Sequence, residues 1–265
     1  MTAEAEVVSG YAEANGARLY YELAGSGAPL VFIHGFGLDR RMWDAQFSFF
    51  ARRRQVLRYD LRGFGRSTLP GAAYRHVDDL AALLDQLQID QAALVGLSLG
   101  GLIALDAALE YPDRVSALVL ADAIASGRAM SAAWNDEYRG IRREARAQGA
   151  AAGKQAWLDF SLFAPTRAHP EAGPLLARLI GDWSGWQLTQ RDPENSNLSA
   201  MGRLAEVRAP TLVVVGERDQ PDFQAIADEL LGIPLARKVV VPGAGHLVPM
   251  EAPGEFNALL EAFLV

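Results

Sequence analysis

The chain has no cysteine among its 265 residues, which excludes disulfide bonds, thiolate catalysis and metal sites built on cysteine. It also lacks any apolar run long enough to cross a bilayer. The stretch from Met1 to Glu6 is acidic and has no apolar core like that of a signal peptide. Together these absences predict a cytoplasmic protein with no membrane partner.

The chain is also short of positive charge. Its formal net charge is −7, and the arginine clusters at residues 52–54 and 142–146 are too short to form a basic stripe. We expect the first cluster in a solvated loop and the second on the polar face of a helix. This charge balance disfavours nucleic acid as a partner. Because half of the residues are apolar and 22% are charged, the composition fits a folded globular protein.

Short apolar runs alternate with helical patterns along much of the chain. An apolar stripe with the spacing i, i+3, i+4 and i+7 runs from Leu80 to Leu87, and a final helix is expected at about residues 253–263. An Asn15-Gly16 pair between two alternating stretches predicts a β-hairpin. Buried strands are expected at residues 30–33, 55–60, 92–95, 117–120, 212–215 and 238–241. This alternation predicts an α/β fold whose mostly parallel sheet carries helices on both faces.

The alternation stops over residues 125–207. This stretch has helical patterns but no convincing strand, and within it residues 150–153 are expected to be a connection of small residues. It holds four of the five tryptophans: Trp134, Trp157, Trp183 and Trp186. We expect a helical insertion over the carboxyl ends of the strands, where open α/β sheets bind ligands. The predicted organisation is a core made of residues 1–124 and 208–265, interrupted by a cap at 125–207.

One turn carries the clearest chemical signal. Gly96-Leu97-Ser98-Leu99-Gly100 follows an apolar run and leads into a helical pattern of small residues. In that context G-x-S-x-G predicts a sharp turn that holds the serine hydroxyl exposed, because larger residues at the glycine positions would collide with the strand or the helix. The helix start also points free N–H groups at the hydroxyl. Ser98 is therefore the candidate nucleophile.

A serine nucleophile needs a base, and the chain has four histidines. His246 follows the last expected strand, which places it at the same sheet edge as Ser98, so it is the predicted base. His34 also follows a strand but precedes turn glycines, and we expect it to shape that loop by hydrogen bonding. His76 begins a helix and His169 lies in the insertion, so both are expected at the surface or in packing.

The base in turn needs a carboxylate to orient it. Asp219 follows the strand at 212–215 and falls between Ser98 and His246 in the chain, which is the order of serine, acid and histidine in this architecture. Asp122 is the alternative, since it lies just past the preceding strand and is able to reach the same imidazole. We favour Asp219 and expect Asp122 to cap a loop.

Two backbone donors are expected to stabilise the oxyanion. One is the N–H of Leu99, which directly follows Ser98 at the helix start. The other is the N–H of Phe36, in the His34-Gly35-Phe36-Gly37 loop, where glycines on both sides let the backbone turn inward. No metal or organic cofactor is implied, because the chain has neither a metal-ligand spacing nor a dinucleotide-binding loop.

Six motifs together resemble the α/β-hydrolase superfamily. They are His34–Gly37, Asp60–Ser67, Gly96–Gly101, Tyr111–Val115, Gly216–Asp219 and Gly243–His246. The resemblance implies a mostly parallel eight-stranded sheet, a helical cap, and a structural loop in which Asp60 and Arg62 tie strand to loop. Within the superfamily the chain resembles the carboxylesterase and 3-oxoadipate enol-lactonase group.

The sequence therefore predicts a serine hydrolase that cleaves an ester or lactone of a small, largely apolar substrate through an acyl-enzyme on Ser98. A carbon–carbon bond hydrolase acting on ring-fission products is an alternative, although Leu97 stands where those enzymes usually have asparagine. A ligand-sensing regulator on the same fold is the non-enzymatic alternative. The tryptophans of the insertion either line an apolar pocket or pack the insertion onto the core. Arg128 and Arg139 are candidates to meet a substrate carboxylate.

Overall fold

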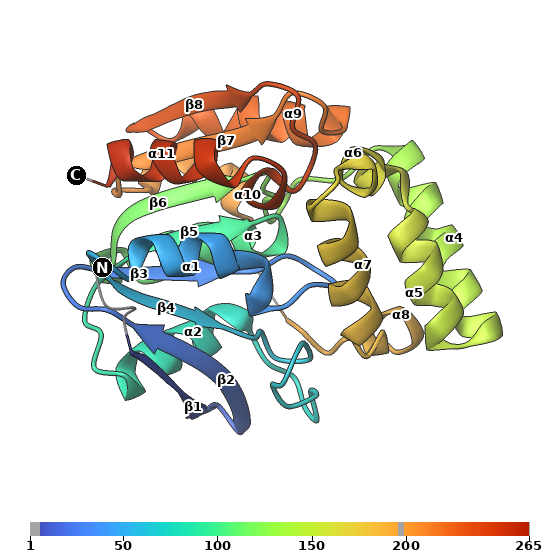
Figure 1. Ribbon diagram of the computed structural model, residues 1–265, viewed down its shortest axis with the longest axis horizontal. Helices are drawn as coiled ribbons and strands as arrows, with labels where there is room; N and C mark the ends of the chain where they lie inside the picture. The colour runs from blue at the N-terminus through green and yellow to red at the C-terminus, as the bar shows by residue number, and fades with distance from the viewer. Residues whose placement is uncertain (1–5, 196–198, 265) are drawn as a thin grey trace.

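Eight strands form one sheet in the order β1-β2-β4-β3-β5-β6-β7-β8 (Figure 1), in a computed structural model that describes residues 6–195 and 199–264. Only β2 runs against its neighbours β1 and β4, and every other adjacent pair is parallel. The strands are β1 (Val7–Ala14), β2 (Ala17–Ala24), β3 (Pro29–Ile33), β4 (Gln55–Tyr59), β5 (Ala92–Leu97), β6 (Val115–Ala121), β7 (Thr211–Gly216) and β8 (Ala236–Val241). The predicted mostly parallel sheet is confirmed.

The hairpin at the start of the sheet forms where Asn15-Gly16 predicts it. Both residues have positive φ angles, 47° and 77°, and Ala14 pairs with Ala17 across the turn. Positive φ at both central positions belongs to the tight turn that matches the twist of paired strands, which explains the Asn-Gly pair.

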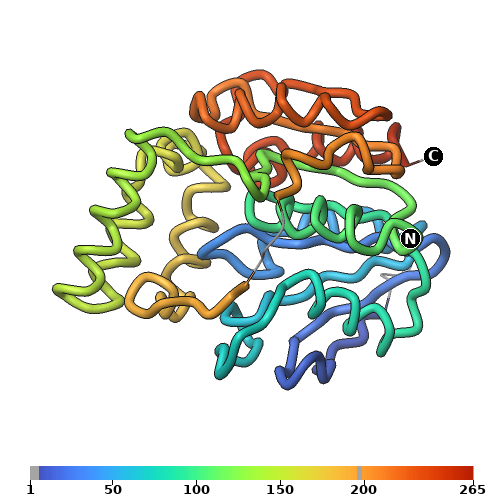
Figure 2. The backbone as a smooth tube through the Cα atoms, turned by 180° about the vertical axis from the view of Figure 1, so that it is seen from behind, coloured from blue at the N-terminus to red at the C-terminus, as the bar shows by residue number. Residues whose placement is uncertain are grey.

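The parallel strands decide which face each helix covers. Right-handed crossovers place α1, between β3 and β4, on one face, and α2, α3 and α9 on the other, because these three connect strands in the opposite direction across the sheet. The last helix, α11, packs beside α1 (Figures 1 and 2). These core helices are α1 (Asp44–Phe50), α2 (His76–Gln86), α3 (Leu99–Glu110), α9 (Pro221–Glu229), α10 (Val248–Glu251) and α11 (Pro253–Phe263).

Five helices lie between β6 and β7, at one end of the sheet (Figure 1). They are α4 (Ala132–Gln148), α5 (Ala150–Asp159), α6 (Ala164–Ala168), α7 (Ala172–Asp182) and α8 (Trp186–Thr189). Short 3-10 helices complete the chain: η1 (Arg40–Trp43), η2 (Pro112–Arg114), η3 (Ser161–Phe163), η4 (Ala200–Gly202), η5 (Leu204–Glu206) and η6 (Leu230–Gly232). The helical insertion is confirmed. No helix within residues 6–195 and 199–264 is both long and apolar enough to span a membrane.

The expectation that residues 150–153 form a connection is wrong. They are the first turn of α5, and the break from α4 is Gly149, whose φ is 94°. Alanine favours helix, so three alanines start α5 as soon as the chain has turned. At Gly153 a Cβ would lie 2.3 Å from Ala145 Cβ, so the missing side chain lets α4 and α5 pack closely.

The insertion is held to the core by polar and aromatic contacts. Gln187 Nε2 donates to the carbonyl of Gly63 at 3.0 Å, and Gln187 Oε1 accepts the indole N–H of Trp183. The Trp183 ring stacks on Phe64 with an interplanar angle of 14°. Two of the insertion's tryptophans, Trp183 and Trp186, do not line the main pocket described below, and Trp183 packs the insertion onto the core.

A buried ion pair fixes the loop after β4. Arg62 donates to both oxygens of Asp79 in α2, at 2.7 and 2.8 Å, and to the carbonyls of Ala14 and Asn15 in the hairpin. Arg62 thus ties this loop to α2 and the hairpin. The Asp60 carboxylate accepts the backbone N–H of Arg66 within the same loop and also pairs with Arg40 in η1 at 3.1 Å. Burial raises the pKa of Asp79 although Arg62 lies beside it, which shows that removing this carboxylate from water is costly. The pairing with Arg62 offsets part of that cost.

Replacing Arg62 by alanine is expected to lower the free energy of unfolding by about 3–5 kcal/mol, because the Asp79 carboxylate stays buried without its cation. Urea denaturation measures the change. Arg208→Ala is the matched control, since the Arg208–Asp113 pair is exposed, and a loss of about 0–1 kcal/mol is expected there. Equal losses in the two variants would contradict this reading of the buried pair.

Candidate active site

Ser98 lies on a strained turn between β5 and α3. Its φ is 52° and its ψ is −111°, a left-handed conformation that is costly for a residue with a side chain. Gly96 and Gly100 permit this turn. A Cβ on Gly96 would lie 2.1 Å from the Gly100 carbonyl oxygen, and a Cβ on Gly100 would lie 2.1 Å from that of Ile33 in β3. Glycine is therefore required at both positions because neighbouring backbone leaves no room for a side chain.

The two residues expected to supply the oxyanion donors line the same pocket as Ser98. Phe36 and Leu99 both line the main pocket, and neither amide is used in the loop and turn hydrogen bonds of the described residues. Leu99 is the first residue of α3, so its N–H has no partner within the helix. Free amides at this point are able to bind an anionic oxygen.

His34 shapes the Phe36 loop as predicted. Its Nδ1 lies 2.8 Å from the Gly35 carbonyl, and its Nε2 accepts the N–H of Leu61 at 2.9 Å. Because Nε2 accepts, the proton lies on Nδ1. Burial lowers the pKa of His34, which favours this neutral form. Both ring nitrogens are occupied, so His34 is unsuited to act as a base.

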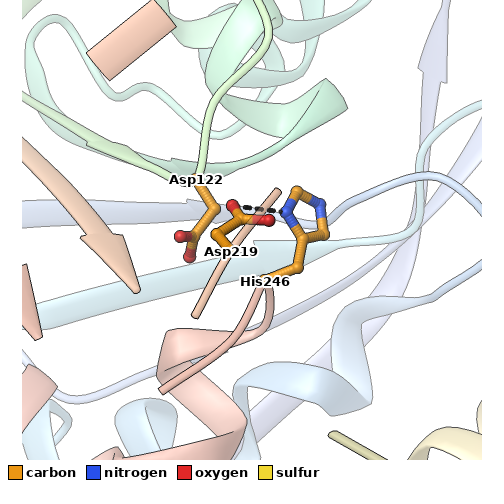
Figure 3. A group of neighbouring side chains, drawn as sticks. All are labelled: Asp122, Asp219 and His246. Carbon is orange, nitrogen blue, oxygen red and sulfur yellow. Dashed lines mark hydrogen bonds and ion pairs between the residues drawn. The ribbon is translucent and has the colours of Figure 1, made fainter. Parts of the chain in front are cut away.

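His246 and Asp219 form a buried hydrogen-bonded pair. Asp219 Oδ2 lies 2.9 Å from His246 Nδ1 (Figure 3), and both side chains are at most 2% exposed. The loops that carry them touch, because a Cβ on Gly216 would lie 2.0 Å from the Gly245 carbonyl oxygen. A carboxylate at hydrogen-bonding distance from one imidazole nitrogen determines which of the two nitrogens carries the proton. No hydrogen bond from Ser98 Oγ is found within the described residues, although Ser98 and His246 line one pocket.

Asp122 lies beside Asp219 and not against the imidazole (Figure 3). Its Oδ1 accepts the N–H of Gly216 at 2.8 Å and its Oδ2 that of Val248 at 3.4 Å, so it caps two loops of the site. Burial, reinforced by the neighbouring Asp219, raises the pKa of Asp122 well above its usual range. Of the two candidate acids, Asp219 is the one that contacts His246.

Asp122, Asp219 and His246 lie close enough together to hold a metal ion, because the ligand atoms of the three side chains are all within 4.8 Å of one another. Hydrogen bonds already account for the arrangement. Asp219 binds His246, and both oxygens of Asp122 accept backbone N–H groups. The donor set is therefore satisfied as a hydrogen-bonded cluster.

A pocket of about 360 Å³ joins these residues to the insertion. Aromatic and aliphatic side chains form most of its wall, and the titratable residues along it in the described part of the chain are Arg128, Tyr138 and His246. Arg128 is paired with Glu229, whereas Arg139 pairs with Asp136 away from the pocket. The insertion contributes Trp134, Tyr138, Trp157, Leu162 and Phe163, and α9 contributes Phe223.

Sequence reasoning missed Tyr138, Leu162 and Phe163 as pocket residues. Each comes from a helix of the insertion, whose packing has no counterpart in a sequence motif. The available signal is the number of aromatic residues in the insertion, where the sequence predicts that four tryptophans either line a pocket or pack onto the core. Phe223 lies with its ring centre 4.2 Å from that of His246, so it packs directly on the imidazole.

A second cavity, of about 460 Å³, adjoins the first at Phe36, Leu99 and Leu102. Its wall differs in charge, because it includes the carboxylates of Asp106, Asp192 and Glu194. His76 also lies on it, and burial lowers the pKa of His76 to about 3, so that imidazole is neutral. His76 is buried, in keeping with the packing role expected of it.

Residues 30–259 match the alpha/beta hydrolase family. The chain belongs to this family. It is 28% identical over 242 residues to 3-oxoadipate enol-lactonase 2 of Acinetobacter baylyi, which covers 89% of this chain and 88% of that protein. The predicted resemblance to the superfamily and its enol-lactonases is confirmed, and the eight-stranded sheet with inserted helices is the α/β-hydrolase fold.

Two solved structures of family members are similar over nearly the whole chain. The enol-lactonase from Burkholderia xenovorans LB400 has a TM-score of 0.84 at 26% identity, covering 96% of this chain and 99% of that one. A thermophilic esterase from Thermogutta terrifontis has a TM-score of 0.78 at 28% identity, covering 97% and 98%. Distant relatives that are esterases and lactonases thus share the fold.

The raised pKa of Asp122 makes the stability of an Asp122→Asn variant depend on pH. Below the usual aspartate pKa the carboxyl is protonated in the folded and the unfolded chain alike. As the pH rises above the usual aspartate pKa, the unfolded chain releases this proton before the folded protein does, so the wild type loses stability that the variant keeps. The free energy of unfolding of Asp122→Asn, relative to wild type, is expected to increase over this range in urea titrations.

Asp122→Ala is the control for this experiment. It removes the acceptors for Gly216 and Val248, so it is expected to be less stable than Asp122→Asn at each pH. A constant difference between Asp122→Asn and wild type across the range would show that Asp122 is ionised in the folded protein.

Proposed function

We propose that the protein is a serine hydrolase that cleaves an ester or lactone bond of a small, largely apolar substrate. The observation that carries the proposal is the buried His246–Asp219 pair, joined at 2.9 Å, in the pocket that Ser98 lines from a strained turn. A histidine oriented by a carboxylate is the arrangement that activates a serine hydroxyl. The names of an enol-lactonase and an esterase among the relatives support the choice of bond.

In the first step Ser98 Oγ attacks the carbonyl carbon of the substrate. His246 accepts the serine proton on Nε2, and Asp219 accepts the hydrogen bond from Nδ1–H and stabilises the imidazolium. The negative charge moves to the former carbonyl oxygen. We assign its stabilisation to the N–H groups of Phe36 and Leu99, at the loop after β3 and the start of α3.

In the second step His246 gives its proton to the leaving alkoxide, and the acyl group stays bonded to Ser98. For a lactone, the alcohol remains attached to the acyl chain. A water molecule then loses its proton to His246 and attacks the acyl carbon. The bond to Ser98 Oγ breaks, His246 returns the proton to Oγ, and the acid is released.

The pocket supports a substrate with an apolar acyl or aryl group. About 360 Å³ is enough for a small organic molecule, and the walls are mostly hydrocarbon and aromatic. Phe36 is held by edge-to-face contacts with Phe64, Trp157 and Trp183, so the insertion steadies the loop assigned to the oxyanion. We accordingly propose that residues 125–207 act as a cap that shapes the substrate pocket.

Hydrolysis of p-nitrophenyl esters from acetate to octanoate tests the proposal. Ser98→Ala is expected to lower kcat by at least about 10⁴-fold, because the nucleophile is removed. Asp219→Asn is expected to lower it by about 10⁴-fold, because the imidazole takes the wrong tautomer, whereas Asp122→Asn is expected to retain most activity. Circular dichroism of each variant confirms folding.

Three outcomes would contradict the assignment. Collapse of activity in Asp122→Asn but not in Asp219→Asn would make Asp122 the acid. Folded wild type that leaves all esters and lactones intact but cleaves a vinylogous diketone would favour the carbon–carbon bond hydrolase, and tight ligand binding without any turnover would favour the regulator.

The chain-length optimum is expected to depend on Trp134. Its ring stacks against Tyr138 with centres 5.1 Å apart, on the pocket wall. Trp134→Ala opens that wall and is expected to shift the ester with the highest kcat/KM toward a longer acyl chain. Trp186→Ala is the matched control, because Trp186 is in the insertion but does not line this pocket. An unchanged optimum in Trp134→Ala would show that the acyl group lies elsewhere.

A further inference from the structure

Glu251, at the end of α10, holds the backbone on both sides of His246. Its Oε2 accepts the N–H of Gly245 at 2.6 Å, and its Oε1 accepts that of Leu247 at 3.1 Å. One carboxylate therefore bridges the peptide that follows His246 and the peptide between Ala244 and Gly245, one residue before it. Because the Cα of His246 lies between these two peptides, the bridge holds in place the backbone from which the imidazole extends.

The same carboxylate is bound by the insertion. Thr166 in α6 donates its hydroxyl to Glu251 Oε1 at 2.6 Å, and Thr166 is fully buried. The backbone of the His246 loop also lies close to α6, because a Cβ on Gly245 would lie 2.6 Å from the Cβ of Pro165. The Phe163 ring lies 6.4 Å from that of His246. The segment from η3 to α6 is thus seated on the His246 loop.

Other polar links between insertion and core reach elements away from this loop. Ser131 binds Asp222 at the start of α9, and Gln187 binds the loop after β4. Ser161 accepts a hydrogen bond from the side chain of Gln220, the neighbour of Asp219. Those links hold the insertion in place without entering the peptides around His246. The Thr166 link differs because it ends on the carboxylate that positions the histidine.

We infer that Glu251 is a positioning residue for His246 and that Thr166 couples the placement of the insertion to the orientation of the imidazole. The inference rests on the proposed function, in which His246 carries protons to and from Ser98. Proton transfer of this kind tolerates little error, and a displacement of about 1 Å is able to cost about 10²-fold in rate. A loosened Thr166–Glu251 link lets the His246 loop shift while the pocket wall stays in place.

Thr166→Val is the decisive variant, because valine keeps the shape of threonine and removes only the hydroxyl. We expect kcat for p-nitrophenyl ester hydrolysis to fall about 3- to 10-fold, with KM within about twofold of wild type. Thr166→Ser restores the hydroxyl and is expected to recover most of the loss. Glu251→Gln, which removes one of the acceptors around His246, is expected to lower kcat by about 10- to 100-fold.

Thr189→Val is the matched control. Thr189 also lies in the insertion, but its hydroxyl donates to the local carbonyl of Trp186. Its kcat is expected to equal that of wild type. A fall in thermal stability alone, with equal kcat in Thr166→Val, Thr189→Val and wild type, would overturn the coupling.

A second readout keeps the test independent of the substrate. The His246 Nδ1 proton, held against Asp219, is expected to give a downfield proton NMR signal that is absent from His246→Ala. This signal should shift or broaden in Thr166→Val and Glu251→Gln and return in Thr166→Ser. If the wild type cleaves no ester or lactone, the proposed function fails, yet the signal still tests the positioning of His246. An unchanged signal in both Thr166→Val and Glu251→Gln would refute the inference.

Discussion

Close backbone contact between the carboxyl ends of the strands is the constraint on which the site depends. Gly100 lies against the end of β3, and Gly216, at the end of β7, lies against the loop that carries His246. A methyl group at either position would force these segments apart. The turn bearing Ser98 and the loops bearing Asp219 and His246 are therefore brought together by the sheet itself. The insertion adds the pocket wall and steadies loops whose positions the core has already determined.

The site concentrates features that oppose folding. Ser98 and Asp122 both have positive φ angles, and Asp122 and Asp219 lie together away from water. Such strain persists only where the surroundings hold it in place. Here backbone N–H groups satisfy Asp122, and the imidazole satisfies Asp219. The central strands β5 and β7, which are buried on both faces, contribute stability that offsets these costs.

The core of the fold could be predicted from sequence because its signals are local. Apolar runs mark the buried strands, Asn15-Gly16 requires its turn, and the chain positions of Asp219 and His246 follow from the order of the strands. Contacts in the insertion are not local. Phe163 lines the pocket, and Gly153 lies within a helix because it packs against Ala145 of α4. Both placements depend on how the helices pack, which no short sequence pattern predicts. The role of Glu251 could not be predicted for another reason. Two of its partners are backbone N–H groups, which every residue type except proline has.

The point of insertion has a consequence for how such a protein is able to diversify. The five helices leave after β6 and return before β7, and these two strands are hydrogen-bonded neighbours, with Ala121 opposite Val214. The sheet therefore holds the two ends of the inserted segment side by side. The entropic cost of closing a loop between fixed ends depends only weakly on loop length, so a segment of different length costs little more. Evolution or recombination is therefore able to exchange the five helices as one unit, but a replacement segment has to supply the contacts that this one makes with Phe36 and with Glu251.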